Sequence, residues 1–256
     1  MPFPLAHPAA VLPFRRCSTP YLNFVALLIG SVTPDVGYCL ERYDVDLLAH
    51  SIRGCFIFSL PLGWVLVLIF HAVCEPLVGL LPARHRQALL PLCRKRKQPW
   101  LAVPVSLLIG AATHVFWDSL THDTGWFVER SSFLQWVLLS WNGHAFHVHR
   151  LLWHASTWIG LLLLYRAYAK TLNGSALQAN VSAAEEKRRY ALWTCLLLLP
   201  LPGAVLTAFL YYARRLWSLA LVPEFLRLSA GLYLVALSVL LIGLGAALKL
   251  KRRSSE

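Results

Sequence analysis

Long apolar runs recur along the 256 residues of this chain and restrict how it can fold. An α-helix rises about 1.5 Å per residue, so roughly 20 apolar residues cross a hydrocarbon core of about 30 Å. The clearest runs of this length are 53–74, 100–121, 148–169, 190–212 and 228–248. Hydrophobic residues make up 57% of the chain and the mean hydropathy is +0.57, which is too apolar for a water-soluble domain of this length. The sequence therefore predicts an integral membrane protein.

These runs predict helices and not strands. A membrane β-barrel needs segments of about ten residues in which apolar and polar side chains alternate, whereas these runs are apolar on every side. Helices also satisfy their own backbone hydrogen bonds, as the lipid interior requires. We expect an all-α fold, a polytopic transmembrane helical bundle with about six crossings.

The N-terminal region allows two interpretations. Two shorter apolar segments, 5–14 and 21–33, are separated by Arg15 and Arg16, so neither spans a bilayer alone without tilt. The pair forms either one crossing or a re-entrant hairpin. One crossing would leave His7 on the cytoplasmic side, whereas a hairpin would return it to the outer side.

The formal charge of +12 follows the predicted topology. With the N-terminal pair counted as one crossing, most Lys and Arg residues fall on one side, including the run Arg94–Lys97. The positive-inside rule places that side, and with it the C-terminus, in the cytoplasm. The basic residues are therefore interpreted as a topology signal, and we expect the lipid bilayer and no nucleic acid as a partner.

The six cysteines are predicted to be core residues. They are Cys17, Cys39, Cys55, Cys74, Cys93 and Cys195. None belongs to a Cys-x-x-Cys pair and most lie in or beside apolar runs, which argues against zinc bound by thiolates. A disulfide stays open only for Cys39, which the topology places outside.

The His and Asp residues concentrate in the first part of the chain. We interpret 1–169 as a helical membrane region with a metal site, and 170–256 as a cytoplasmic loop, at 171–189, followed by two scaffold transmembrane helices. In the first part, Leu27–Thr33 and Leu107–Thr113 share the pattern Leu-Leu-Ile-Gly-x-x-Thr. So short a match is only a faint sign of duplication.

Ionisable side chains gather at the outer end of one predicted helix, and within a membrane such residues indicate function. His114, Asp118 and His122 follow at intervals of four and share one helix face. Imidazole nitrogen and carboxylate oxygen bind zinc, manganese or iron. The alternative is a hydrogen-bonded polar stripe between helices, but Ser, Thr or Asn could form one at lower cost. We therefore predict a divalent metal as cofactor, with zinc preferred over manganese and iron.

One helix cannot enclose an ion, so further ligands are expected from elsewhere. Asp35 follows Pro34 where the first crossing ends, and His50 begins the next crossing on the same side. Each has an alternative role, Asp35 as a cap or a solvated carboxylate and His50 as an interfacial imidazole. His7 joins them only in the hairpin arrangement.

A second group of histidines lies between residues 144 and 154. His147, Arg150 and His154 share a helix face, but nearby Trp136 and Trp153 indicate an aromatic belt at the membrane interface. We favour the belt, and a role of Arg150 in holding an anionic substrate group stays open.

Several segments together resemble a family of uncharacterised bacterial membrane proteins. They are Met1–Ala10, Gly30–Asp35, His50–Gly54 and the stretch from His114 to His122. Over roughly residues 1–165 the chain is also distantly similar to the YdjM-like membrane-bound metal-dependent hydrolases. The resemblance implies a metal centre formed by His7, Asp35, His50, His114 and Asp118, and so favours the hairpin. The chain departs from the YdjM-like pattern where Leu47-Leu48-Ala49 replaces a His-Arg-Gly before His50. One ligand is thus missing, and His122 is a candidate to replace it.

We expect a metal-dependent hydrolase in the bacterial inner membrane, with its site open to the outer face. The metal would lower the pKa of a bound water and polarise a phosphoryl or acyl oxygen, with Asp35 or His122 as general base. The substrate would be an amphiphilic phosphoester or ester, such as a lipid or a lipid-linked molecule.

Two other functions fit the same residues. An ion- or proton-coupled transporter needs polar residues that continue inward, but residues 105–112, below His114, carry no ionisable side chain. A non-catalytic assembly protein with a structural metal would unfold when the metal is lost, whereas an enzyme would mainly lose turnover.

Overall fold

The computed structural model describes residues 3–15, 21–94, 98–141, 144–174, 181–213 and 221–254. Cys17 and residues 95–97 of the basic run lie outside this part. The chain forms two compact units. Unit 1 contains Met1–Val36, Asp44–Val67 and Arg96–Lys170, and unit 2 contains Gly37–Tyr43, Leu68–Lys95 and Thr171–Glu256.

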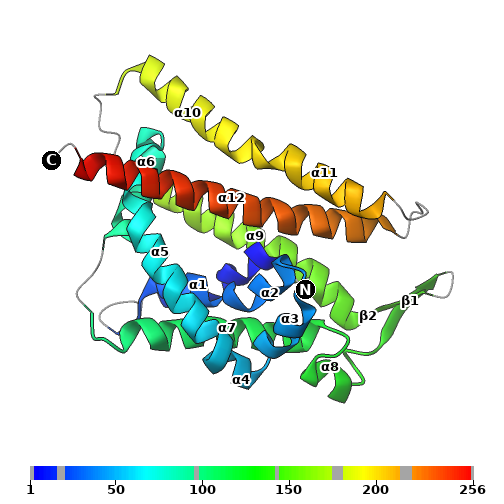
Figure 1. Cartoon of the computed structure of the whole chain (residues 1–256). Coiled ribbons are helices and arrows are strands. Elements are labelled where there is room, and N and C mark those ends of the chain that lie inside the picture. Colours follow the sequence, from blue (N-terminus) through cyan, green and yellow to red (C-terminus); the bar gives the residue numbers. More distant parts are fainter. Residues whose placement is uncertain are drawn as a thin grey trace. The chain divides into compact units, whose positions relative to one another are not determined.

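Helices form most of the described chain, as predicted (Figure 1). Unit 1 holds the 3₁₀ helix η1 (Pro4–Arg15), α1 (Phe24–Gly30), the 3₁₀ turn η2 (Thr33–Asp35), α3 (Tyr43–Ala49), α4 (Ile52–Gly54), the π-helical turn η3 (Cys55–Ser59), the first part of α5 (Leu60–Gly79), α7 (Ala102–Thr121), α8 (Trp126–Arg130), β1 (Val137–Trp141), β2 (His144–His147) and α9 (Val148–Asn173). Unit 2 holds α2 (Val36–Cys39), the rest of α5, α6 (Ala83–Cys93), α10 (Ala183–Leu198), α11 (Pro200–Tyr212) and α12 (Val222–Arg253).

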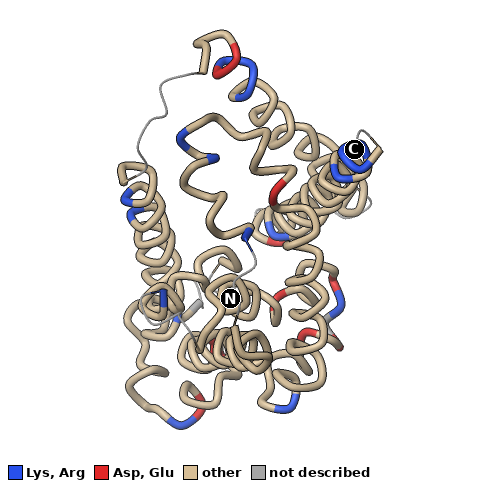
Figure 2. Tube along the Cα trace, turned by 90° about the vertical axis from the view of Figure 1, so that its left-hand side faces the viewer, with Lys and Arg blue, Asp and Glu red and all other residues tan. Residues whose placement is uncertain are grey.

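Within the described residues, four helical segments are long and apolar enough to cross a bilayer. They are Ile52–Gly79, Ala102–Thr121, Ala183–Tyr212 and Val222–Arg253. Long stretches of helix are free of Lys, Arg, Asp and Glu, which lie mainly near helix ends and in connections (Figure 2). The four segments overlap four of the runs that the sequence predicts as crossings, and together they indicate a helical membrane protein.

The count of six crossings is not confirmed. Residues 148–169 are helical within α9, but this helix is not among the four segments, and it carries His149, Arg150 and His154 near its start. The N-terminal pair forms η1, of 12 residues, and α1, of 7 residues. Each of these helices is too short to cross a bilayer alone.

The N-terminal segments η1 and α1 form a hairpin. His7, in η1, has its Nε2 3.5 Å from Asp118 Oδ1 on α7. Asp35, which follows α1, has its Oδ1 3.5 Å from Nε2 of His114 on the same helix. A single straight crossing would hold His7 and Asp35 at opposite ends, so the structure favours the hairpin alternative.

The two matching Leu-Leu-Ile-Gly segments pack against each other in unit 1. A Cβ on Gly30 would overlap the carbonyl oxygen of Leu107, and a Cβ on Gly110 would overlap that of Leu27. The two contacts are equivalent, because Leu27 and Gly30 occupy the same positions in the first segment as Leu107 and Gly110 in the second. In each contact the glycine of one segment faces the leucine carbonyl oxygen of the other. Glycine at both positions lets the backbones of α1 and α7 approach closely. The sequence match therefore has a structural role whatever its origin.

The β1–β2 hairpin corrects the all-α prediction. β1 and β2 pair antiparallel, with Leu139 opposite Phe146 and Ser140 opposite Ala145. The sequence between them is Asn142-Gly143, the type of pair that most strongly favours a two-residue hairpin turn. The residues 142 and 143 lie outside the described part of the chain. The prediction missed the hairpin because it treated this region as part of an aromatic belt.

Helix α10 corrects part of the loop predicted at 171–189, because it begins at Ala183. Ser182 caps the helix, its Oγ accepting a hydrogen bond from Glu185 N at 3.2 Å. The Arg189 guanidinium donates to the carbonyl oxygens of Gly79 and Leu81 at 3.2 and 3.0 Å. The start of α10 is thereby attached to the turn between α5 and α6 in unit 2.

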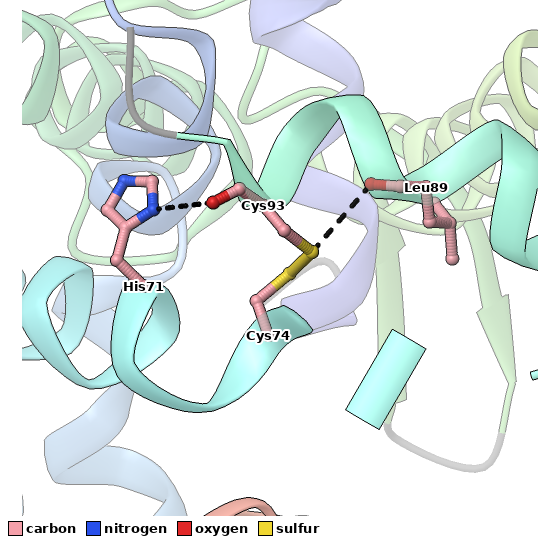
Figure 3. The surroundings of a disulfide bond; sticks show 4 residues. All are labelled: His71, Cys74, Leu89 and Cys93. Carbon is pink, nitrogen blue, oxygen red and sulfur yellow. Dashed lines mark hydrogen bonds between the residues drawn. A yellow bond between two sulfur atoms is a disulfide. The ribbon is translucent and has the colours of Figure 1, made fainter. Parts of the chain in front are cut away.

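A disulfide joins Cys74 of α5 to Cys93 of α6, which contradicts the prediction that both are unpaired core residues (Figure 3). The His71 Nδ1–H also donates to the carbonyl oxygen of Cys93 at 3.4 Å. The two cysteines pack with Val78 in an apolar cluster, so they are core residues as well. Spacing along the sequence does not reveal such a pair, because the turn after α5 brings α6 back onto it.

We expect alanine at Gly110 or at Gly30 to lower the free energy of unfolding by about 1–3 kcal/mol, because the methyl group would push α1 and α7 apart. The measurement is the apparent melting temperature in detergent. Gly243→Ala is the matched control, since a Cβ there meets no described atom within 4 Å. A Gly110→Ala protein as stable as Gly243→Ala would contradict the proposed close contact.

Replacing Cys74 by serine should lower the free energy of unfolding by about 2–4 kcal/mol, because the disulfide closes a loop in the unfolded chain. Thermal unfolding without reductant checks this, with Cys195→Ser, at an exposed thiol, as control. Dithiothreitol should reduce the stability of the wild type to that of Cys74→Ser. An unchanged melting temperature in both tests would show that the bond has no stabilising role.

Candidate metal centre

Four of the six predicted ligands meet in unit 1. Asp35, His50, His114 and Asp118 each offer one ligand atom, and these atoms all lie within 4.8 Å of one another. Asp35, His114 and Asp118 are buried, and His50 is partly buried. The four residues come from three separate parts of the chain, which the fold brings together.

Local structure explains the position of each residue. Asp35 ends the η2 turn, which begins three residues after the end of α1, and the Thr33 Oγ1–H donates to the carbonyl oxygen of Ile29 at 2.6 Å. His50 follows the last residue of α3. His114 and Asp118 lie one turn apart on α7, as their spacing predicts.

Backbone hydrogen bonds fix the tautomers of two imidazoles. The Nδ1–H of His50 donates to the carbonyl oxygen of Asp46 at 2.8 Å. The Nδ1–H of His114 donates to the carbonyl oxygen of Ser31, also at 2.8 Å. A carbonyl oxygen only accepts, so Nδ1 is the protonated nitrogen in both rings and each neutral ring has a lone pair on Nε2.

These two Nε2 atoms face each other at 3.1 Å. Asp118 Oδ2 lies 3.2 Å from each of them, and Asp35 Oδ1 lies 3.6 Å from His50 Nε2 and 3.5 Å from His114 Nε2. Two lone pairs cannot form a hydrogen bond with each other. The arrangement needs a positive charge among these atoms, either as a proton on an imidazole or as a metal cation.

The carboxylates of this group lack other partners. Both side-chain oxygens of Asp35 and both of Asp118 are buried and accept no hydrogen bond from any described residue. Ligand atoms at 2.0–2.2 Å from one tetrahedral ion are about 3.3–3.6 Å apart. The five separations that involve a histidine Nε2, of 3.1–3.6 Å, lie in or close to this range. The residues present therefore fit a divalent cation with mixed nitrogen and oxygen ligands.

His7 lies beside this group. Its ring stacks on that of His114, with centroids 3.7 Å apart and planes at 21°. Its Nε2 is 3.5 Å from Oδ1 of Asp118, the oxygen that faces away from the contacts with His50 and His114. The structure thus brings His7 to the site, at the other oxygen of the shared carboxylate.

His122 lies at the end of α7, one turn after Asp118. Its Nδ1–H donates to the backbone carbonyl oxygen of Asp118 at 2.9 Å, and Nδ1 is 3.8 Å from Asp118 Oδ1. Burial lowers the pKa of His122 below its usual value, so the ring is neutral near pH 7 and has a lone pair on Nε2. That atom is buried and lacks a hydrogen-bond partner among the described residues.

Asp46 is a member of the site that the sequence prediction missed. Besides its carbonyl contact, its Oδ1 lies 3.4 Å from Nδ1 of His50. Burial raises the pKa of the Asp46 carboxyl above its usual value. The four-residue spacing between Asp46 and His50 on a helix could have revealed the pair, because Asp behind His is a common support for a ligand.

In the second histidine group, His149 and Arg150 both contact Asp123. The His149 ring is buried, its Nδ1–H donates to the carbonyl oxygen of Leu134 at 2.9 Å, and its Nε2 lies 2.5 Å from Asp123 Oδ1. Arg150 donates to the other Asp123 oxygen at 2.8 Å. Burial opposes ionisation of Asp123, but the interactions with His149 and with the charge of Arg150 outweigh it and hold the pKa of Asp123 below its usual value.

His154 packs against aromatic rings. Its ring lies 4.5 Å from that of Trp153 and 6.1 Å from that of Phe146, measured between centroids. His154 is thus a histidine of unit 1 outside the candidate metal centre.

A family model described as a domain of unknown function, DUF4184, matches residues 1–246. The chain belongs to the DUF4184 family. The match covers the candidate metal centre and the helices of unit 2 up to residue 246 of α12. No curated protein and no solved structure matches this DUF4184 protein.

Proposed function

We propose that this DUF4184 protein is a membrane-embedded, metal-dependent hydrolase. The observation that carries the proposal is the pair of Nε2 lone pairs on His50 and His114, 3.1 Å apart between two buried carboxylates. A divalent cation at this point would satisfy both nitrogens and one oxygen each of Asp35 and Asp118.

A metal suits this site better than a proton does. A proton on one imidazole is directed mainly at one acceptor, whereas the two Asp residues present four buried oxygens without hydrogen bonds from described residues. The Nδ1–H bonds of His50 and His114 to carbonyl oxygens are the support that metal-ligating histidines usually have. Mixed nitrogen and carboxylate ligands favour zinc, with manganese and iron as alternatives.

A bound ion would supply two kinds of chemistry, a water whose pKa falls towards about 7 and a polarised substrate oxygen. The chain would supply the general base. His122 is the stronger candidate, because its Nε2 is buried, has a lone pair and lacks a partner among the described residues. Asp35 is the second candidate, through the oxygen that does not bind the ion.

The position of the site favours an amphiphilic substrate. His50 lies two residues before the candidate span Ile52–Gly79, while His114 and Asp118 lie in the last turns of the candidate span Ala102–Thr121. The site is therefore expected near the membrane surface, within reach of a phosphoester or ester of a lipid or lipid-linked molecule. We propose a distant kinship to YdjM-like hydrolases and a location in the bacterial inner membrane. We also propose about six crossings that include α9, a re-entrant hairpin formed by η1 and α1, and a cytoplasmic C-terminus.

Protein purified in detergent should contain zinc, manganese or iron in stoichiometric amount, and Asp35→Asn and His50→Ala should lose most of it. The same variants should lose roughly a hundredfold or more of the hydrolysis of p-nitrophenyl phosphate or p-nitrophenyl octanoate, because the activated water is lost. His154→Ala is the matched control and should keep metal and turnover. Metal is measured by mass spectrometry and hydrolysis by release of p-nitrophenolate.

Three results would count against this function. If purified wild-type protein contains no stoichiometric transition metal, both the metal-dependent hydrolase and the protein with a structural metal are excluded. Metal-loaded wild type that cleaves neither substrate, and that unfolds when a chelator removes the ion, would favour a structural metal. Turnover retained in Asp35→Asn and His50→Ala would place catalysis elsewhere.

Sidedness can be measured with cysteines introduced at Arg130 and at Arg84, which are both exposed. In intact cells of a background whose six native cysteines are replaced by serine, a membrane-impermeant maleimide should label position 130 and leave position 84 unlabelled until the cells are opened. The charge distribution predicts this result, because it places Arg84 with the cytoplasmic basic residues. The reverse pattern would invert the topology.

A further inference from the structure

Asp118 has two oxygens with different neighbours. Oδ2 lies 3.2 Å from Nε2 of both His50 and His114. Oδ1 lies 3.5 Å from Nε2 of His7 and 3.8 Å from Nδ1 of His122. A carboxylate whose two oxygens face separate sets of nitrogen ligands is in the position of a bridge between two ions.

An ion bound by Asp35, His50, His114 and Asp118 does not account for the buried position of the His7 side chain. Its side chain is almost fully buried, with 2% of its surface exposed, and its Nε2 has no hydrogen-bond partner among the described residues. The distance of 3.5 Å to Asp118 Oδ1 is too long for a good N–H···O hydrogen bond. It agrees with the separation of about 3.3–3.6 Å expected for two ligand atoms that share a tetrahedral ion.

We propose that Asp118 bridges two divalent cations and that His7 binds the second one through Nε2. The second cation would be bound by His7 Nε2 and Asp118 Oδ1. His122 is also close to this oxygen, with Nδ1 at 3.8 Å. The stacking of the His7 and His114 rings, with centroids 3.7 Å apart, directs the two imidazoles to opposite oxygens of one carboxylate. The inference rests on the proposed function, since the first ion is the one held by Asp35, His50, His114 and Asp118.

A second ion would narrow the substrate class of the site. Two ions that share a carboxylate can hold both the attacking and the leaving oxygen of an in-line displacement, an arrangement common among phosphoester-cleaving enzymes. The second position therefore favours a phosphoester over a carboxyl ester.

The experiment is a metal count on full-length protein in detergent, loaded with Mn²⁺ and desalted. Wild type should bind two ions per chain and His7→Ala should bind one, while the control His154→Ala should bind two. Electron paramagnetic resonance supplies a second measurement. Two Mn²⁺ ions bridged by Asp118 should show magnetic coupling in wild type, and His7→Ala should show the hyperfine pattern of an isolated ion.

The outcomes separate this inference from the proposed function. One ion in wild type, with the spectrum of isolated Mn²⁺, overturns the second position and leaves the single-ion hydrolase intact. No ion in wild type overturns both. Two ions in folded His7→Ala, or none, overturns the role of His7. Should His7→Ala fail to fold, the spectrum of Mn²⁺-saturated wild type decides alone, because coupled ions support the bridge and isolated ions overturn it.

Discussion

The close contact between α1 and α7 is the constraint on which the rest of unit 1 depends. Gly30 and Gly110 each leave room for the backbone of the other helix. This contact sets the position of the Ser31 carbonyl oxygen, which orients the His114 ring, and of Asp35, which follows α1. A side chain at either glycine would therefore affect the geometry of the candidate centre as well as helix packing.

Two carboxylates and three histidines in one buried site are costly unless opposite charges or hydrogen bonds compensate them. Backbone carbonyls satisfy the outer nitrogens of His50 and His114, and no comparable partner among the described residues serves the inner atoms. A polar stripe that only held helices together would pair its own donors with its own acceptors. The arrangement in this protein instead points acceptors at acceptors, which is the pattern expected around a cation.

The disulfide in unit 2 and the charge distribution lead to opposite expectations for the side of the membrane on which Cys74 and Cys93 lie. Cys74 and Cys93 lie near the end of the span Ile52–Gly79 that the positive-inside rule assigns to the cytoplasm. Disulfides are rare in the cytoplasm because thiols are kept reduced there. With the predicted topology the pair is a reduced dithiol in the cell, and with the opposite topology it is a stable bond.

The sequence alone indicated a helical membrane protein, four segments long and apolar enough to cross a bilayer, and the shared helix face of His114 and Asp118, because apolar length and four-residue spacing are local properties of a chain. It could not determine that η1 folds back to bring His7 to Asp118, or that Cys74 pairs with Cys93. Those relations join residues far apart in the sequence or depend on side-chain orientation. Only the tertiary structure decided them, since the packing of α1 on α7 through Gly30 and Gly110 brings distant groups together in unit 1, and the return of α6 onto α5 does so in unit 2.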